Sequence, residues 1–222
     1  MPRPDEPDHV AMAREAYDHA VDRYLDAVGT TVSAEFETTI DLAALRAFAT
    51  DLATAVRGSV IDVGCGPGRV TRLLADHGLD VRGVDVSVRM VEAARTAHPD
   101  LRFDVASLTD LPAADRSMAG VVSWYSIITT PLDRLGEVWR EFDRVLVDAG
   151  RMLVAFQAGD GEVVERSDDG SPTLRLHRHR ADAVATSLDG EGFEVVLDLR
   201  RAAALDHETT PQAILIARRA RG

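Results

Sequence analysis

The chain has 222 residues, of which 25 are basic and 37 acidic, giving a formal net charge of −12. A chain of this length buries enough apolar surface for one domain with a single core, and its acidic balance argues against a nucleic-acid backbone as the main partner, because phosphate binding needs clustered cations. Every basic residue is an arginine, so Schiff-base chemistry and lysine general-base chemistry are excluded.

The N-terminal segment and the single cysteine bear on location. Residues 1–8 contain three prolines and no apolar core like that of a secretion signal, so we expect a disordered tail there. No apolar run approaches the length that crosses a bilayer. Cys65 stands alone, which excludes an intramolecular disulfide and fits a reduced, cytoplasmic setting. We expect a monomer or homodimer without nucleic-acid or membrane partners.

The first half of the chain alternates helices and strands. Apolar residues recur at helical spacing in the first two segments, and Ser87 has the position and chemistry of an N-cap for a helix that ends before Pro99. The predicted elements, in order, are helices at 10–28 and 40–56, a strand at 59–63, a helix that stops near Gly78, a strand at 81–85, the helix after Ser87 and a strand at 101–105.

The second half begins in the same way and then changes. Residues 118–124 form a near-continuous apolar run, typical of a strand buried on both faces. Ser-Asp-Asp-Gly-Ser-Pro, between residues 162–166 and 173–177, is a hairpin signal. The other predicted elements are a helix after Pro131 that continues to Gly150, a strand at 151–156, a helix at 181–188 and strands at 193–199 and 213–218.

Strands that alternate with helices predict an α/β fold with a parallel, doubly wound sheet. Parallel neighbours need a crossover helix, whereas a tight connection makes them antiparallel. Residues 200–210 are too polar and too few for a good helix. The last strand should therefore enter the sheet antiparallel.

The most informative stretch is Val60–Val70, which reads Val-Ile-Asp-Val-Gly-Cys-Gly-Pro-Gly-Arg-Val. Alternating glycines after a strand let backbone approach a ligand, because a Cβ there would block it. Cys65 is a small filler within this loop rather than a nucleophile. Asp85 ends the next strand, where a carboxylate accepts hydrogen bonds from a ribose diol. This pairing predicts a nucleoside-bearing cofactor.

Two side chains discriminate between cofactors. A dinucleotide fingerprint has glycine three residues after its second glycine, where this chain has Arg69. Asp62 lies two residues before the first glycine and faces the head of the ligand. A carboxylate would repel a pyrophosphate but attract, directly or through water, the ammonium of an amino-acid moiety.

The run from Asp62 to Gly68 resembles the D-x-G-x-G-x-G motif of the class I S-adenosylmethionine-dependent methyltransferases, in particular those that act on small molecules. The resemblance covers the chain from about residue 10 to its end. It implies a Rossmann-like seven-stranded sheet with a reversed last strand, S-adenosylmethionine as cofactor and S-adenosylhomocysteine as product. Residues 9–222 would be one domain, divided into lid helices (9–57), a cofactor-binding core (58–158), a hairpin insertion (159–180) and a C-terminal part (181–222).

The resemblance also implies the cofactor contacts. The loop residues Gly64, Cys65, Gly66 and Gly68 would bind the cofactor, with Asp62 at its amino-acid end and Asp85 on the ribose. The remaining implied contacts are Val86 and Met90 against adenine, the stretch Ala106, Ser107 and Leu108, the backbone of Ser123 at the methionine portion, and the lid tyrosines Tyr17 and Tyr24. The stretch that begins at Ala106 resembles the family's G-D-A-x-x-L-P segment, with Ser107 in place of its aspartate.

A general base is not evident in the sequence. Thr129 and Thr130 stand where relatives have histidines. Methyl transfer needs a base only when the acceptor is a poor nucleophile. His177 and His179 are candidates on one face of a strand, although flanking arginines favour solvent exposure for them. Further candidates are His19, Tyr17 and Tyr24, and for the tyrosines packing against the domain is the alternative.

Trp124 and Tyr125 stand at a strand end, a position that favours core packing over a cation–π contact with a sulfonium. No metal site is expected.

Two alternative functions remain. A nicotinamide oxidoreductase would need the glycine that Arg69 replaces. A methyltransferase-like protein that binds the cofactor without transferring methyl, as a partner, a sensor or a catalyst of another reaction, is motivated by the missing histidines and by Ser107.

Overall fold

The computed structural model describes residues 6–55, 58–167 and 172–219. Its centre is a seven-stranded sheet of strand order β3-β2-β1-β4-β5-β9-β8. The first five strands of that order are parallel, and β9 is antiparallel to both β5 and β8. The strands are β1 (Ser59–Val63), β2 (Val81–Asp85), β3 (Arg102–Val105), β4 (Met118–Trp124), β5 (Leu146–Gln157), β8 (Phe193–Arg201) and β9 (Gln212–Arg219). The predicted doubly wound fold with a reversed last strand is confirmed.

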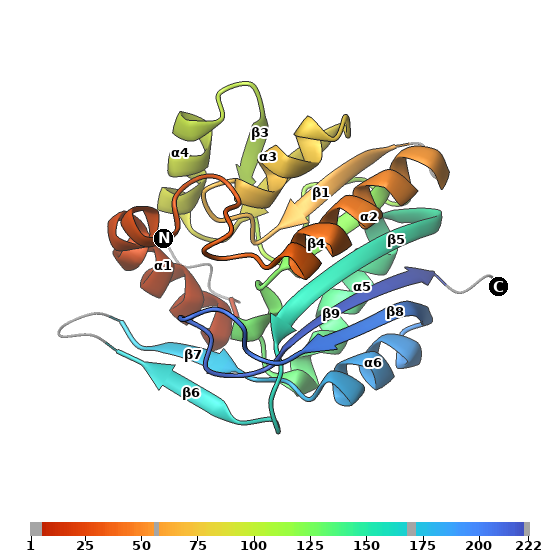
Figure 1. The fold of residues 1–222 in the computed structure, drawn as a ribbon. Helices are drawn as coiled ribbons and strands as arrows, with labels where there is room; N and C mark the ends of the chain where they lie inside the picture. Colours follow the sequence, from red (N-terminus) through yellow and green to blue (C-terminus); the bar gives the residue numbers. More distant parts are fainter. Residues whose placement is uncertain (1–5, 56–57, 168–171, 220–222) are drawn as a thin grey trace.

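Helices cover both faces of this sheet (Figure 1). On one face, Leu45 and Phe48 of α2 and Leu74 of α3 pack with residues of the central strands. On the other face, Trp139 and Phe142 of α5 pack beside α6. The helices are α1 (Asp8–Val28), α2 (Thr39–Ala55), α3 (Arg69–Asp76), α4 (Val88–Ala97), α5 (Leu135–Val145) and α6 (Ala181–Gly190), with short 3-10 turns η1 (Ile127–Thr129) and η2 (Leu132–Arg134). Two layers of apolar side chains thus fix the sheet on which the site is built.

The predicted hairpin forms a small sheet of its own, in which β6 (Val163–Arg166) pairs antiparallel with β7 (Leu174–His177). It lies beside α1, past the ends of the main strands (Figure 1). Residues 168–171 of its predicted turn, and residues 1–5 of the predicted tail, lie outside the described residues. Within the part of the chain that the structure describes, no helix is long and apolar enough to span a membrane.

One predicted boundary is wrong. The helix after Pro131 was expected to continue to Gly150, but α5 ends at Val145 and Leu146 already belongs to β5. The N–H groups of Arg116 and Ser117 donate to the carbonyls of Arg144 and Val145, and Leu146 pairs with Met118. Pairing with β4 therefore replaces the last helical turn, which the apolar spacing alone does not reveal.

Candidate functional site

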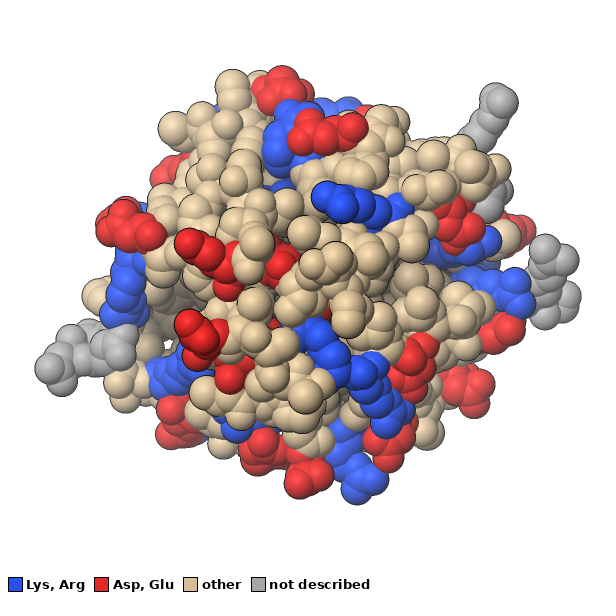
Figure 2. All heavy atoms as spheres, in the orientation of Figure 1, with Lys and Arg blue, Asp and Glu red and all other residues tan. Residues whose placement is uncertain are grey.

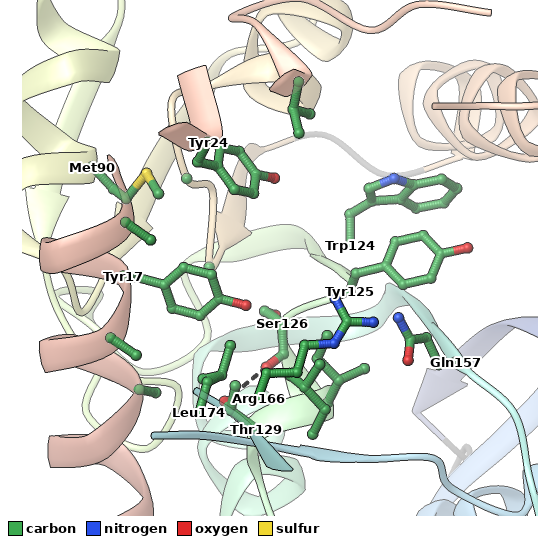
Figure 3. A pocket seen from close by; sticks show the side chains of 18 of the residues that line it. Tyr17, Tyr24, Met90, Trp124, Tyr125, Ser126, Thr129, Gln157, Arg166 and Leu174 are labelled. Carbon is green, nitrogen blue, oxygen red and sulfur yellow. Dashed lines mark hydrogen bonds between the residues drawn. The ribbon is translucent and has the colours of Figure 1, made fainter. Parts of the chain in front are cut away.

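A cavity of about 610 Å³ opens at the carboxyl ends of the central strands, the edge at which open α/β sheets bind ligands. Side chains from distant parts of the chain point into it (Figure 3). The residues that line it include Tyr17 and Tyr24 from α1, Gly64 and Gly66 of the glycine loop, Asp85 at the end of β2 with Val86 and Met90 beyond it, Trp124 at the end of β4 with Tyr125, Ser126 and Thr129 beyond it, Gln157 of β5, Arg166 and Leu174 of the hairpin, His207 and Glu208 before β9, and Gln212 of β9.

The glycines of the loop have different surroundings, although all three have positive φ. A Cβ at Gly64 would lie 2.1 Å from the Cβ of Ser126, whereas a Cβ at Gly66 would meet nothing within 4 Å. A Cβ at Gly68 would lie 2.8 Å from the His98 ring, so Gly68 packs against the protein and does not line the cavity. Only Gly66 keeps open space beside the loop.

Asp85 connects the glycine loop to the start of α4. Its Oδ2 accepts a hydrogen bond from the Gly66 N–H and its Oδ1 from the Ser87 N–H, both at 2.8 Å. Burial raises the pKa of this carboxyl, and backbone hydrogen bonds, those from Ser87 and Gly66 foremost, oppose that rise. Ser87 caps α4 as predicted, because its Oγ accepts from the Met90 N–H. Asp85 thus lines the cavity in a fixed orientation.

Asp62 lies beneath the loop and does not line the cavity. Its side chain is 1% exposed, and its Oδ2 accepts from the Thr71 hydroxyl at 2.6 Å. Within the described residues its Oδ1 has no hydrogen-bond partner. Burial raises the pKa of Asp62 to about 7. The predicted interaction of Asp62 with a ligand ammonium, directly or through water, stays a prediction, and it would use this oxygen.

The raised pKa makes stability depend on pH. Between the unfolded value near 4 and the folded value of about 7, the native protein keeps a proton that the unfolded chain has released, so stability falls as pH rises through this window. We expect Asp62→Asn to remove this fall and to gain on the wild type by on the order of 4 kcal/mol between pH 4 and pH 8. Urea unfolding across this range tests it, with Glu92→Gln on the surface of α4 as control. If the free energy of unfolding depends on pH in the same way for the wild type and Asp62→Asn, the raised pKa of Asp62 is contradicted.

Several other predicted contacts lie behind the cavity wall. Among the stretch after β3, Leu108 lines the cavity and Ala106 and Ser107 do not. The Ser107 hydroxyl lies 3.2 Å from the Thr109 hydroxyl. Ser123 is fully buried and its Oγ lies 2.6 Å from the Oγ of Ser126, which itself reaches the cavity.

Cys65 is buried outside the cavity lining, and burial raises the pKa of its thiol. A thiol that stays protonated is a weak nucleophile. The filler interpretation fits this environment, because the Sγ lies 2.8 Å from where a Cβ on Gly83 would be.

Of the candidate bases, the two tyrosines line the cavity and the three histidines do not. Tyr17 and Tyr24 line the cavity with their rings in an edge arrangement, 6.5 Å between centroids. Burial raises the pKa of both hydroxyls. His177 and His179 stack at 5.8 Å, yet neither lines this cavity. His19 is exposed on α1 and does not line it either.

The expectation of a solvent-exposed His179 is wrong. Its side chain is 2% exposed, and its Nε2 lies 3.3 Å from the Ile127 carbonyl. Burial lowers its pKa to about 4. The hairpin packs this ring against η1, a contact that the neighbouring arginines in the sequence did not indicate.

Several lining residues were not predicted from the sequence. Trp124 and Tyr125 were expected in the core, but both face the cavity. Tyr125 has φ of +59°, a backbone turn that aims the residues after β4 at the cavity and that sequence spacing does not reveal. Gln157, Arg166 and the loop before β9 carried no recognisable motif. The polar loop that precedes β9 could have indicated lining residues, because it leads into a strand at the ligand-binding edge of the sheet.

Arg69, which breaks the dinucleotide fingerprint, has a structural partner. Its Nη2 lies 2.7 Å from both carboxylate oxygens of Glu37, and its Nε donates to the Thr31 carbonyl at 3.1 Å. Arg69 and Glu37 are both buried and both line the cavity. The first turn of α3 is thereby joined to the segment between α1 and α2, which closes this side of the cavity.

Comparisons with known proteins agree with this geometry. Residues 60–150 match the model of a methyltransferase domain family. The demethylmenaquinone methyltransferase of Renibacterium salmoninarum is 29% identical over 153 residues, which cover 65% of this chain and 62% of that protein. The malonyl-[acyl-carrier protein] O-methyltransferase of Pseudescherichia vulneris is 31% identical over 98 residues, 44% of this chain and 38% of that protein. The matched regions therefore span less than two thirds of these relatives.

Solved structures share the architecture at low sequence identity. Magnesium protoporphyrin IX methyltransferase from Synechocystis PCC 6803, with bound S-adenosylmethionine, superposes with a TM-score of 0.71 and 18% identity over 98% of this chain and all of that chain. The [4+2]-cyclase SpnF superposes with a TM-score of 0.73 and 18% identity over 97% of this chain and 98% of that one. A fold shared by two reactions does not specify either one. With the domain match and the curated relatives, these findings show that residues 60–150 match a methyltransferase domain and that the chain shares the fold of a structure solved with S-adenosylmethionine bound.

Proposed function

We propose that the cavity binds S-adenosylmethionine and that the protein transfers its methyl group to a small-molecule acceptor. The observation that carries this proposal is the junction at Asp85, where one carboxylate holds both the glycine loop and the start of α4 at the edge of the cavity. That junction lies within the part of the chain that matches the methyltransferase domain family.

The residues present fit this cofactor. Gly66 leaves open space beside the loop, and Val86 and Met90 supply an apolar wall for a base. Each oxygen of Asp85 accepts one backbone hydrogen bond, which leaves acceptor capacity for a ribose diol. The unpaired Oδ1 of Asp62 beneath the loop is a buried acceptor that suits an ammonium, directly or through water.

When bound, the sulfonium supplies an activated methyl group with its leaving group already in place. The protein's part is then to hold an acceptor atom in line at about 3 to 3.5 Å and to exclude water. Tyr17 and Tyr24 cover the cavity from α1 and keep their protons, so they can donate hydrogen bonds. Neither His177 nor His179 lines the cavity, so we propose neither as a general base, whereas His207 does line it. We propose that the lining residues mainly position the acceptor.

Both of the curated relatives described above are named as methyltransferases, which supports methyl transfer over a protein that only binds the cofactor. Their named acceptors differ from each other, a demethylmenaquinone in one and malonyl-[acyl-carrier protein] in the other. For this chain we propose a small molecule as acceptor, and a cytoplasmic location on the strength of its single, buried cysteine.

Asp85→Ala tests the cofactor assignment. Loss of the carboxylate leaves ribose hydroxyls without a partner, and we expect affinity for S-adenosylhomocysteine to fall by about 1 to 3 kcal/mol. Isothermal titration calorimetry measures this change. Asp104→Ala, on the neighbouring strand β3 and outside the cavity, is the matched control and should bind as the wild type does. Equal affinities for Asp85→Ala and the wild type would refute the ribose assignment.

A further inference from the structure

The cavity has a second polar region, on the side of the hairpin and away from the glycine loop. Arg166, the last residue of β6, and Gln157, the last residue of β5, both line the cavity there. Figure 3 shows the Arg166 guanidinium and the Gln157 amide turned toward the same space, beside the Tyr125 ring. Neither residue belongs to the part of the chain that matches the methyltransferase domain family, which ends at residue 150.

The other charged residues of the cavity have interaction partners, and Arg23 is among them. Glu37 pairs with Arg69, and Glu208 pairs with Arg201 at 2.5 and 2.7 Å. Asp85 accepts its two backbone hydrogen bonds. By contrast, no carboxylate of the described residues forms an ion pair with Arg166. Among the residues that the structure describes, the Arg166 guanidinium therefore has no carboxylate partner, in a protein whose net charge is −12.

Gln157 adds a neutral hydrogen-bonding group. Its neighbour across the sheet, Gln212, uses its amide on the Thr210 carbonyl at 2.7 Å. In the described parts of the chain, the Gln157 amide has no such partner. An uncompensated guanidinium next to an unpaired amide is a donor set for one planar anion, because the guanidinium fork matches the two oxygens of a carboxylate and the amide can donate a third hydrogen bond.

We propose that the methyl acceptor carries a carboxylate, which Arg166 and Gln157 bind at the hairpin side of the cavity. This inference rests on the proposed methyl transfer, because it names the class of molecule that shares the cavity with the cofactor. One guanidinium balances one negative charge, which fits a monocarboxylate. Trp124 and Tyr125 supply an apolar wall for the rest of the acceptor. The hairpin thus determines acceptor specificity, and the glycine loop binds the cofactor.

The test uses the full chain with saturating S-adenosylhomocysteine and matched ligand pairs that differ only in charge: benzoate and benzamide, cinnamate and cinnamamide, octanoate and octanamide. Binding is followed by thermal unfolding and calorimetry. At least one carboxylate should bind more tightly than its amide, and Arg166→Gln should weaken that carboxylate by about tenfold without changing its amide. The difference in affinity between the carboxylate and its amide should also decrease with added salt, because Arg166 is a solvent-exposed residue of the cavity.

Arg175→Gln is the matched control, since Arg175 lies on the same hairpin, is exposed and already pairs with Glu165 at 2.8 Å. It should keep the carboxylate preference. Equal binding of acids and amides, no binding of any pair, or an unchanged preference in Arg166→Gln would overturn the proposal. Competition by sodium sulfate as strong as by the carboxylates would instead identify a general oxyanion site and would also overturn it.

The two levels of the proposal can fail separately. If S-adenosylhomocysteine does not stabilise the wild type, the proposed methyl transfer fails, and the acid and amide pairs can still be compared on the protein without it. If the cofactor product binds equally to the wild type and Arg166→Gln but no pair shows a charge preference, only the carboxylate inference fails.

Discussion

Gly64→Ala should destabilise the protein before any ligand is added. The new Cβ would lie 2.1 Å from the Cβ of Ser126, at a backbone φ of +74°. Ser126 cannot easily retreat, because its hydroxyl donates to the Val63 carbonyl at 2.7 Å. Overpacking and the left-handed backbone together should lower the free energy of unfolding by about 2 to 5 kcal/mol. Urea unfolding measures this change.

Gly66→Ala should reduce ligand affinity much more than protein stability. A Cβ at Gly66 meets no protein atom within 4 Å and Gly66 lines the cavity, so we expect a small loss of stability, about 1 kcal/mol, with a loss of S-adenosylhomocysteine affinity of tenfold or more. Gly192→Ala is the control, because Gly192 also has positive φ and open space but lies outside the cavity. If Gly66→Ala binds as tightly as Gly192→Ala, the glycine loop does not contact the ligand.

Arg69→Met should have the second large effect. It leaves the Glu37 carboxylate, 2% exposed, without its ion-pair partner, and a buried charge that loses its partner costs about 3 to 5 kcal/mol. Affinity for the cofactor should fall as well, because both residues line the cavity. Chemical denaturation and calorimetry measure the two changes.

Arg72→Met, one residue below the first turn of the same helix, is the matched control. Arg72 pairs with the exposed carboxylates of Asp76 and Asp100, so its loss should cost less than about 1 kcal/mol. Replacing both members of the buried pair, in Arg69→Met with Glu37→Leu, should recover part of the lost stability. Equal costs for Arg69→Met and Arg72→Met would show that the buried pair does not hold the segment between α1 and α2.

The elements that could be predicted from sequence depend on local patterns. Strand β1, the glycine loop, β2 and the Ser87 cap follow from apolar runs, glycine spacing and capping chemistry within about 30 residues. The reversed last strand followed from the lack of a helix between residues 200 and 210. Each of these signals is carried by the segment that forms the element.

The rest depends on contacts between distant segments. Arg69 reaches Glu37 across 32 residues of chain, and Arg201 reaches Asp41 across 160. The burial of His179 and the orientation of Arg166 depend on where the hairpin packs. Arg69 with Glu37, and Arg201 with Asp41 and Glu208, form buried ion pairs. On the face of the molecule shown in Figure 2, acidic and basic side chains are interspersed. Composition alone therefore could not single out Arg166, which has no carboxylate partner among the described residues.

Thermal unfolding with S-adenosylmethionine, S-adenosylhomocysteine and NAD in parallel distinguishes the cofactors that the cavity could bind. A ligand at 100 times its dissociation constant stabilises the native state by about 2.7 kcal/mol. Stabilisation by the first two ligands and not by NAD is the predicted result. No shift with either of the first two, or a shift with NAD alone, would show that the glycine loop and Asp85 do not bind S-adenosylmethionine.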